Sequence, residues 1–301
     1  MGIAIRTEGL TKYYGKARGI VDVDLEVPGG EVFGFLGPNG AGKTTTIRLL
    51  VDHIRPSSGR AEVLGLDAQR EPMAIRRRIG LLPSDMLLYP RLTGREFLAY
   101  LGNLRGGVDT AERDALVERF GVELDRPIRQ LSTGNRQKLP LVAAFMHRPE
   151  LLILDEPTVG VDPLVQQEFQ ALVREVRAEG RTVFLSSHTL SEVERVADRV
   201  GIIREGALVV TERVEELKHK AIRRLEFDFP EVVSPEPFLA LDGVRAAEVD
   251  RDGTVLRLAI EGPVGGAIML AAQHRPINVI SEEPDLEELF LAYYRPAASG
   301  R

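Results

Sequence analysis

The segment Gly37-Pro38-Asn39-Gly40-Ala41-Gly42-Lys43-Thr44 is the most informative part of this sequence about its fold. It matches G-x-x-x-x-G-K-[ST], a pattern in which a glycine-rich loop wraps a phosphate group. Before it, residues 31–36 form a compact apolar run between turn signals, which predicts a buried strand. After it, residues 44–54 carry apolar side chains at helical spacing and end before Pro56. A strand, a glycine loop and a helix in this order are the context that the pattern requires.

The composition of the loop predicts how it would bind a nucleotide. Glycines let backbone N–H groups approach phosphate oxygens, and the helix that follows adds the positive end of its dipole. Lys43 is expected to pair with the β- and γ-phosphates, and the hydroxyl of Thr44 to ligate Mg²⁺. We predict a nucleotide site made of residues 37–44 together with Thr45.

A second cluster of polar residues follows the apolar run Leu151–Leu154, which reads as a strand. Asp155 at the end of this strand could reach the same Mg²⁺, directly or through water. Glu156 would then polarise the attacking water as a general base. A strand that ends in two carboxylates is common and more often structural, but the phosphate loop favours the catalytic interpretation here.

The remaining pattern predicts two domains, residues 1–220 and 221–301. In the first, residues 3–27 alternate as strands, residues 72–121 look mostly helical, and strands then alternate with helices, which favours a mainly parallel sheet. In the second, predicted strands and short helices follow the order β-α-β-β-α-β, which is typical of a ferredoxin-like α+β domain. A last helix is predicted over residues 286–294, and disorder over residues 297–301.

Composition narrows the function further. The 301 residues carry a formal net charge of −6, which argues against a nucleic-acid partner, since such proteins usually present a basic surface. There is no cysteine, which fits a reducing compartment. No signal-peptide pattern and no apolar stretch of membrane-spanning length is apparent, so a transport role would require another polypeptide to form the path.

Further motifs resemble those of the ATP-binding subunits of ABC transporters. Residues 131–137, Leu-Ser-Thr-Gly-Asn-Arg-Gln, are similar to the signature loop of that family, and residues 155–163 to its Walker B and D-loop segment. His188 stands where the family has its switch histidine. Tyr14 resembles the aromatic residue that stacks on adenine, with Tyr13 as the alternative. The resemblance covers residues 1–220, with five motifs in the family's order.

The resemblance implies an ABC ATPase fold: a P-loop NTPase core with an antiparallel β subdomain and a helical subdomain. It implies a head-to-tail dimer that encloses ATP, with Ser132 and Gly134 of one subunit holding the γ-phosphate bound to the other. Asp162 would connect the two sites, and His188 would contact the γ-phosphate. The preference for ATP is inferred from the family.

Several positions depart from the family's pattern. Ser84 stands where a glutamine usually reaches Mg²⁺ and the attacking water, and serine could act only through a bridging water. Asp85 could substitute, although a solvated loop residue is the simpler interpretation. Thr133 and Asn135 replace the first glycine and the glutamine of the signature. Pro140 predicts a kink or a late start in the helix that follows.

Two functions remain open at this point. One is a transporter subunit on the cytoplasmic face of the cell membrane, paired with a membrane permease and a second ATP-binding subunit, identical or different. The other is a soluble ABC-type ATPase that acts on ribosomes or nucleic acid, although that kind usually has two cassettes or a long coiled coil. Residues 87–96 resemble the stretch that contacts the permease, and the C-terminal domain resembles that of ABC-2-type exporters. Export of an unidentified substrate is therefore expected.

Overall fold

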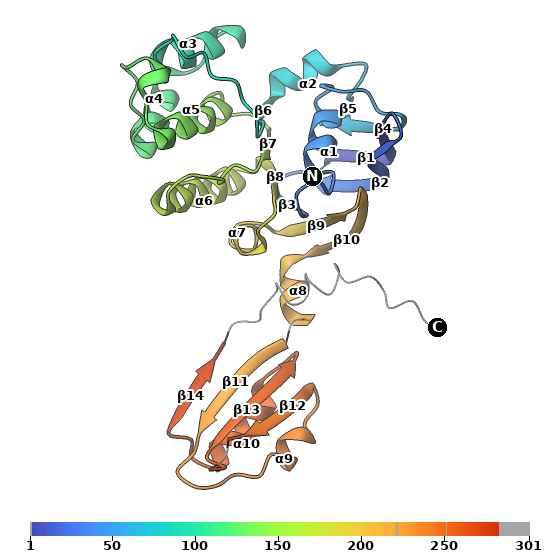
Figure 1. Ribbon diagram of the computed structural model, residues 1–301, viewed down its shortest axis with the longest axis vertical. Coiled ribbons are helices and arrows are strands. Elements are labelled where there is room, and N and C mark those ends of the chain that lie inside the picture. The colour runs from blue at the N-terminus through green and yellow to red at the C-terminus, as the bar shows by residue number, and fades with distance from the viewer. Residues whose placement is uncertain (1, 221, 251, 283–301) are drawn as a thin grey trace. The chain divides into compact units, whose positions relative to one another are not determined.

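The computed structural model describes residues 2–220, 222–250 and 252–282 (Figure 1). It divides into two compact units, Met1–Thr211 and Glu212–Arg301. The segment from 212 to 220, which the sequence analysis counted with the first domain, falls in the second unit.

An antiparallel sheet with the strand order β2-β1-β4-β5 forms one part of the first unit. Its strands are β1 (Ile3–Tyr14), β2 (Ala17–Pro28), β4 (Ser58–Val63) and β5 (Leu66–Asp67). The turn between β1 and β2 uses Gly15 at a φ of 60°, a left-handed conformation that suits glycine. The sequence predicted β1 and β2 but missed β4 and β5, which are short and carry few buried side chains.

A six-stranded sheet with the order β10-β9-β3-β8-β7-β6 forms the second part. Its strands are β3 (Val32–Leu36), β6 (Ile79–Leu82), β7 (Leu151–Asp155), β8 (Thr182–Ser187), β9 (Arg199–Arg204) and β10 (Ala207–Arg213). The pairs β3–β8, β3–β9, β6–β7 and β7–β8 are parallel, which confirms the predicted mainly parallel sheet. Strands β3, β7 and β8 are buried throughout. Because they pair in parallel, their carboxyl ends lie at the same edge of the sheet.

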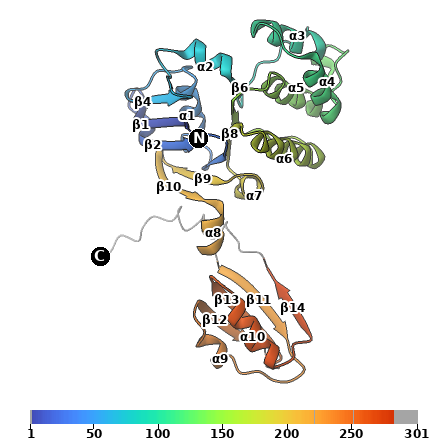
Figure 2. The same cartoon turned by 180° about the vertical axis from the view of Figure 1, so that it is seen from behind.

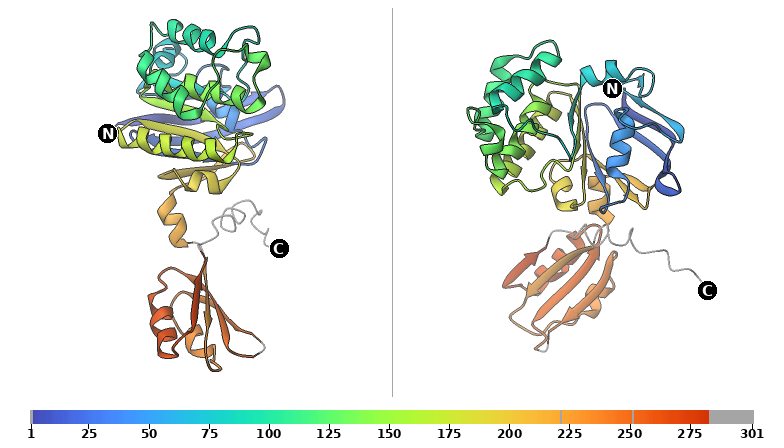
Figure 3. Two further views of the ribbon diagram at one scale, coloured as in Figure 1. Left: turned by 90° about the vertical axis from the view of Figure 1, so that its left-hand side faces the viewer. Right: turned by 45° about the horizontal axis from the view of Figure 1, so that its top comes forward.

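Helix α1 (Lys43–Leu50) lies between these two sheets, as the right-hand view of Figure 3 shows. Ile47 and Leu50 of α1 are buried in a core that also includes Ile5 from β1 and Phe184 from β8. The helix ends at Leu50, four residues before the predicted end at residue 54. Because α1 packs on both sides, the loop that precedes it is held against a rigid core.

A group of helices lies on the side of the parallel sheet opposite helix α1 (Figure 1). It comprises α3 (Gly94–Leu104), α4 (Thr110–Phe120), α5 (Thr133–Phe145) and α6 (Pro163–Ala178), with α2 (Pro72–Arg78), a 3₁₀ turn (Ile128–Gln130) and α7 (Leu190–Glu194) nearby in the chain. Thr93 and Glu96 form a capping box that fixes the start of α3. Helix α5 begins directly after Ser132 and runs through Pro140, so the alternative of a late helix start is wrong.

The second unit contains a four-stranded antiparallel sheet with the order β12-β13-β11-β14. Its elements are α8 (Val214–Lys220), β11 (Ile222–Asp228), α9 (Glu236–Leu239), β12 (Val244–Val249), β13 (Val255–Glu261), α10 (Gly265–Gln273) and β14 (Asn278–Ser281). From β11 onward this is the ferredoxin-like arrangement that the sequence predicted. Figure 2 shows α10 on the near face of the sheet, where Phe227, Phe238 and Leu258 form the core. The helix and the disordered tail predicted after residue 282 lie outside the described residues.

Among the residues that the structure describes, none of the helices has the length and apolar character needed to cross a bilayer.

Candidate nucleotide and catalytic site

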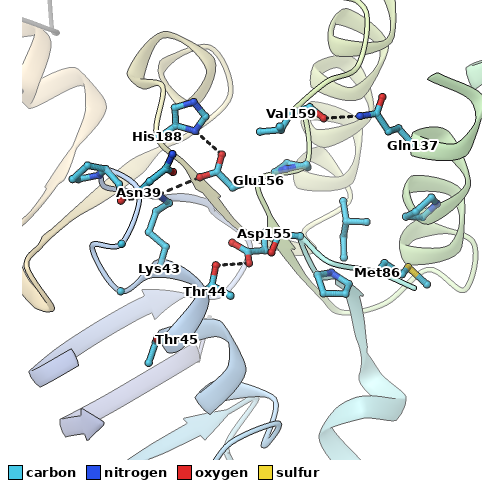
Figure 4. A pocket seen from close by; sticks show the side chains of 18 of the residues that line it. Asn39, Lys43, Thr44, Thr45, Met86, Gln137, Asp155, Glu156, Val159 and His188 are labelled. Carbon is cyan, nitrogen blue, oxygen red and sulfur yellow. Dashed lines mark hydrogen bonds and ion pairs between the residues drawn. The ribbon is translucent and has the colours of Figure 1, made fainter. Parts of the chain in front are cut away.

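Most of the predicted site residues line one cleft of about 740 Å³, at the edge where β3, β7 and β8 have their carboxyl ends (Figure 4). The phosphate loop follows β3, Asp155 ends β7, and His188 follows β8. Ligands bind at this edge of open α/β sheets because neighbouring loops diverge there and leave a crevice. The cleft is lined by Tyr14, Asn39, Gly40, Gly42, Lys43, Thr44, Thr45, Ser84, Asp155, Glu156 and His188, among others.

The phosphate loop needs its glycines for steric reasons. At Gly42, where φ is 116°, an added Cβ would lie 2.6 Å from Cγ2 of Ile20. At Gly37 an added Cβ would lie 2.6 Å from the carbonyl oxygen of Ile203. Both contacts are shorter than packed atoms tolerate, so a side chain at either position would push the loop off the core. Pro38, Asn39, Gly40 and Gly42 line the cleft. Gly37 and Ala41 are buried and are not among its lining residues.

Lys43, Glu156 and His188, predicted as catalytic residues, form one connected group (Figure 4). The Nζ of Lys43 lies 3.1 Å from Oε1 of Glu156, and Nδ1 of His188 lies 2.7 Å from Oε2. Lys43 also donates to the carbonyl oxygens of Gly37 and Pro38 at 2.5 and 3.2 Å. The Lys43 side chain is only 6% exposed, so its charge depends on these partners.

The backbone of Glu156 adopts an uncommon conformation. Its φ is 53°, in the left-handed region that non-glycine residues seldom adopt. Its N–H donates to both the carbonyl oxygen and the hydroxyl of Ser186 on β8, at 3.3 and 3.1 Å. Such a conformation costs of order 1–3 kcal/mol and persists only where surrounding contacts hold it. The bend carries the chain away from β7 and leaves the Glu156 carboxylate at the cleft.

Asp155 and Thr44 meet as predicted for a metal site. The hydroxyl of Thr44 donates to Oδ2 of Asp155 at 2.8 Å, and the hydroxyl of Ser186 donates to Oδ1 at 2.6 Å. Asp155 is 2% exposed. Ser84 lines the same cleft, whereas Asp85 forms an ion pair with Arg48 of α1 at 2.9 Å. This ion pair makes Asp85 a poor substitute for the missing glutamine.

The aromatic side of the cleft is formed by Tyr14. Tyr14 is 45% exposed and its hydroxyl lies 3.4 Å from the hydroxyl of Thr45. The Nζ of Lys12 lies 5.6 Å from the centre of the same ring. Tyr13 does not line the cleft, so the geometry favours Tyr14 of the two candidates.

The signature residues Ser132 and Gly134 do not line this cleft, although their neighbours Thr133 and Arg136 do. Ser132 caps α5 by accepting a hydrogen bond from the N–H of Asn135 at 3.2 Å. The Thr133 hydroxyl accepts from Arg136 at 3.2 Å, a contact that the family's glycine could not make. Ser132 is exposed and Gly134 is half-buried, so both predicted phosphate ligands lie away from the cleft and are reachable from solvent.

Asp162 also stands outside the cleft. It is exposed, and its carboxylate caps α6 by accepting from the N–H of Val165 at 3.0 Å. This local role accounts for an aspartate before Pro163 without requiring a second subunit.

Ser186 and Ser187, the last two residues of β8, were not among the predicted site residues. Both are buried, at 0% and 2% exposure, and Ser186 contacts Asp155 and Glu156 directly. A signal was present in the sequence: two hydroxyl residues follow the apolar run 183–185 and directly precede His188. Parallel strands in one sheet end at one edge, so these serines were candidates for the site.

Comparison with known proteins agrees with this geometry. Residues 20–159 match the ABC transporter family. The chain is 35% identical over 300 residues to the bacitracin transport ATP-binding protein BcrA of Bacillus licheniformis, covering 97% of both chains. It is 36% identical over 302 residues to the daunorubicin/doxorubicin resistance ATP-binding protein DrrA of Streptomyces peucetius, covering 96% of this chain and 92% of that protein.

A solved structure is similar in fold as well. It is described as the ATP-binding subunit of an ABC transporter, with a TM-score of 0.66 and 29% identity, covering 71% of this chain and 92% of that one. These likenesses favour the transporter over the alternative of an ATPase that acts on ribosomes or nucleic acid. The chain therefore belongs to the ABC transporter family, as an ATP-binding subunit with ATPase activity.

Proposed function

We propose that this chain hydrolyses Mg·ATP at the Lys43–Glu156–His188 group and thereby powers export through a separate membrane subunit. The observation that carries the proposal is the position of Glu156, whose two carboxylate oxygens contact Lys43 and His188. The carboxylate is 15% exposed, so it faces the cleft while its charge is held by the protein.

Each residue of the group has a distinct role in this proposal. Glu156 accepts a proton from the attacking water, whose oxygen forms a bond to the γ-phosphorus while the bond to the β,γ-bridging oxygen breaks. Lys43 exchanges its contact with Glu156 for the phosphate oxygens and stabilises the charge that develops there. His188 contacts the γ-phosphate and holds Glu156. Tyr14 stacks on the base.

The residues present suit Mg²⁺. Thr44 and Asp155 offer a hydroxyl and a carboxylate oxygen 2.8 Å apart, and Mg²⁺ prefers oxygen ligands and is often held by one or two protein groups together with phosphates. Mg²⁺ would neutralise phosphate charge, and Ser84 could reach it through a water.

The proposal includes a head-to-tail dimer. Ser132 and Gly134 lie at the start of α5, where backbone N–H groups suit an anion. An added Cβ at Gly134 would meet no atom within 4 Å, so this end of the helix is open to a phosphate bound on another subunit. Asp162 would join the two sites. The second subunit is identical or a related chain.

The names of the relatives support a proposal for the class of cargo. Two are named for transport of bacitracin and for resistance to daunorubicin and doxorubicin, and another, 33% identical over 307 residues, for linearmycin resistance in Bacillus subtilis. We propose export of a compound of this antibiotic type, with the chain at the cytoplasmic face of the membrane. Leu87 and Tyr89, which are 89% and 51% exposed, provide an apolar contact for the permease.

The proposal is tested by capturing tagged Glu156→Gln protein, with Mg·ATP present, from detergent-solubilised membranes of its own cell. A multi-spanning membrane protein in stoichiometric amount is expected. Leu87→Ser should reduce its recovery, whereas Met73→Ser, which alters a comparably exposed apolar residue on α2, should not. Recovery of ribosomal or DNA-associated proteins without a membrane partner would contradict transport, and a Glu156→Gln protein with normal turnover would contradict the catalytic assignment.

A further inference from the structure

We infer that Glu192, on α7, is a positioning residue for ATP hydrolysis: it fastens the loop that carries His188 to the loop that follows Glu156. The inference rests on the proposed function, because it assigns Glu192 a role through those two residues. Glu192 does not line the nucleotide cleft and lies behind it.

One carboxylate oxygen of Glu192 joins the two loops. Its Oε2 accepts a hydrogen bond from the hydroxyl of Thr158 at 2.9 Å and another from the hydroxyl of Ser187 at 3.0 Å. Thr158 lies two residues after Glu156, and Ser187 lies immediately before His188. A carboxylate oxygen has two lone pairs and can accept both hydrogen bonds at once.

The contact extends to both sides of His188. The hydroxyl of Ser187 also accepts a hydrogen bond from the N–H of Thr189 at 3.0 Å, so Glu192 fixes the residue before His188 and, through it, the residue after. The side-chain amide of Gln166 lies 3.5 Å from both Oε1 of Glu192 and the carbonyl oxygen of Thr158. The network thus links α6, α7 and both loops.

Burial makes the two loops dependent on this acceptor. Thr158 is 6% exposed and Ser187 is 2% exposed, so water cannot easily replace Glu192 as a partner for their hydroxyls. A buried polar group without a partner is unfavourable, and the loops would shift to find one. Hydrogen bonds to an ionised carboxylate are also stronger than those to a neutral group.

The loop after Glu156 needs such an anchor because of its backbone. Glu156, the residue after β7, has a φ of 53°, which a non-glycine residue seldom adopts unless surrounding contacts hold it. Ser186 holds the loop at its start, through the N–H of Glu156, and Glu192 holds it two residues later. The distance of 2.7 Å between Glu156 and His188 is therefore set from both sides of the sheet edge.

The test compares the full chain carrying Glu192→Ala, Glu192→Gln, Thr158→Val, the double variant Thr158→Val/Glu192→Ala, and Glu156→Gln as the reference for lost catalysis. Glu118→Ala is the control, because Glu118 is an exposed glutamate on α4 away from the cleft. For each protein we would measure kcat and KM for ATP, the melting temperature, and amide hydrogen exchange of residues 157–162 and 187–190.

Glu192→Ala is expected to lower kcat about tenfold to a hundredfold, with KM changed by less than about threefold, because misplacing a reacting group by a fraction of an ångström costs rate and leaves binding intact. Glu192→Gln should recover part of the rate, since its amide oxygen still accepts. The double variant should lose no more than Glu192→Ala alone, because both changes break one contact. Exchange should rise in both loops.

Two outcomes would overturn the inference. In one, Glu156→Gln is inactive while Glu192→Ala turns over at the rate of the unmodified chain. In the other, kcat, ATP affinity and melting temperature fall together and Glu192→Gln restores none of them, which would make Glu192 a residue of the fold alone. A Glu156→Gln chain that still hydrolysed ATP would contradict the proposed function instead. Amide hydrogen exchange of the two loops would then show by itself whether Glu192 holds them.

Discussion

The two units of this chain place their polar side chains in opposite ways. In the first unit, polar and charged groups lie buried at the strand ends, with Lys43, Asp155 and Ser186 at 5%, 2% and 0% exposure. In the described part of the second unit, no polar or charged residue is buried to this degree. Its ion pairs cross the sheet in solvent, as between Arg257 and Glu226, 2.6 Å apart, with side chains 59% and 31% exposed.

This difference separates groups kept for chemistry from groups kept at a surface. A buried charge loses its hydration and is tolerated only where partners compensate for it. An exposed ion pair contributes little, because water and salt screen it. The first unit therefore bears a thermodynamic cost at the edge of its sheet, and the second unit bears none that the structure shows. Four substitutions test this difference between the two units.

The largest effect is expected for Lys43→Ala. Loss of a cation that stabilises a transferred phosphoryl group lowers activity by about a thousandfold or more. It would also leave the side chain of Glu156, 15% exposed, with the hydrogen bond to His188 as its remaining contact in this group. The measurement is kcat/KM for ATP, with Lys16→Ala as the control at an exposed lysine of the β1–β2 turn. Comparable losses in both variants would point to a general charge effect.

Next in size is Phe238→Ala, which tests whether the second unit has a core of its own. Phe238 is 0% exposed and packs in the core of that unit. Its removal should destabilise the unit by about 3–5 kcal/mol. Calorimetry should show the unfolding transition of the second unit at a lower temperature. ATP hydrolysis, measured below that temperature, should keep its rate. Leu239→Ala, at a neighbour that is 48% exposed, should have little effect. Equal loss of ATPase activity would show that the units are not energetically separate.

A smaller effect comes from His147, a buried imidazole in the first unit. Burial and the nearby Arg105 lower the pKa of His147 from 6.5 to about 4, and its Nε2 lies 3.0 Å from the carbonyl oxygen of Ile79. The unfolded chain takes up a proton at higher pH than the folded chain, so stability falls as pH drops from 6.5 toward 4. We expect a loss of about 2 kcal/mol between about pH 7 and pH 5.

Urea unfolding at the two pH values measures this loss. His147→Gln should flatten the dependence, whereas His274→Gln, at an exposed histidine of the second unit, should leave the first unit's dependence unchanged. If the free energy of unfolding of His147→Gln fell with pH as steeply as that of the unmodified chain, other groups would be responsible for the pH effect.

The smallest effect is expected for Arg257→Gln, which removes the cross-strand ion pair with Glu226. Because both side chains reach solvent, the free energy of unfolding should change by less than about 1 kcal/mol. Thermal unfolding would measure it, and ATP hydrolysis should be unaffected. A loss above about 2 kcal/mol would mean that the exposed charges of the second unit matter as the buried charges of the first do.

Much of the fold could be predicted because its main elements carry local patterns. The apolar runs before the phosphate loop and before Asp155 predicted β3 and β7, and the alternating segments after residue 221 predicted the ferredoxin-like order. The short strands β4 and β5 and the hairpin of β9 and β10 were not predicted. Their stability comes from neighbouring strands, and short runs give little periodic signal of their own.

A phosphate-binding loop could be predicted from the sequence alone, because the glycine pattern and the lysine are contiguous and their chemistry is local. The meeting of distant residues could be seen only in the folded chain: Thr44 and Asp155 are 111 positions apart, and Ser186 and Asp155 are 31 apart. The tertiary structure also showed Asp85 paired with Arg48, and Glu192 beneath both catalytic loops. Hydrogen bonds of this kind depend on strand order and register, which a local pattern does not contain.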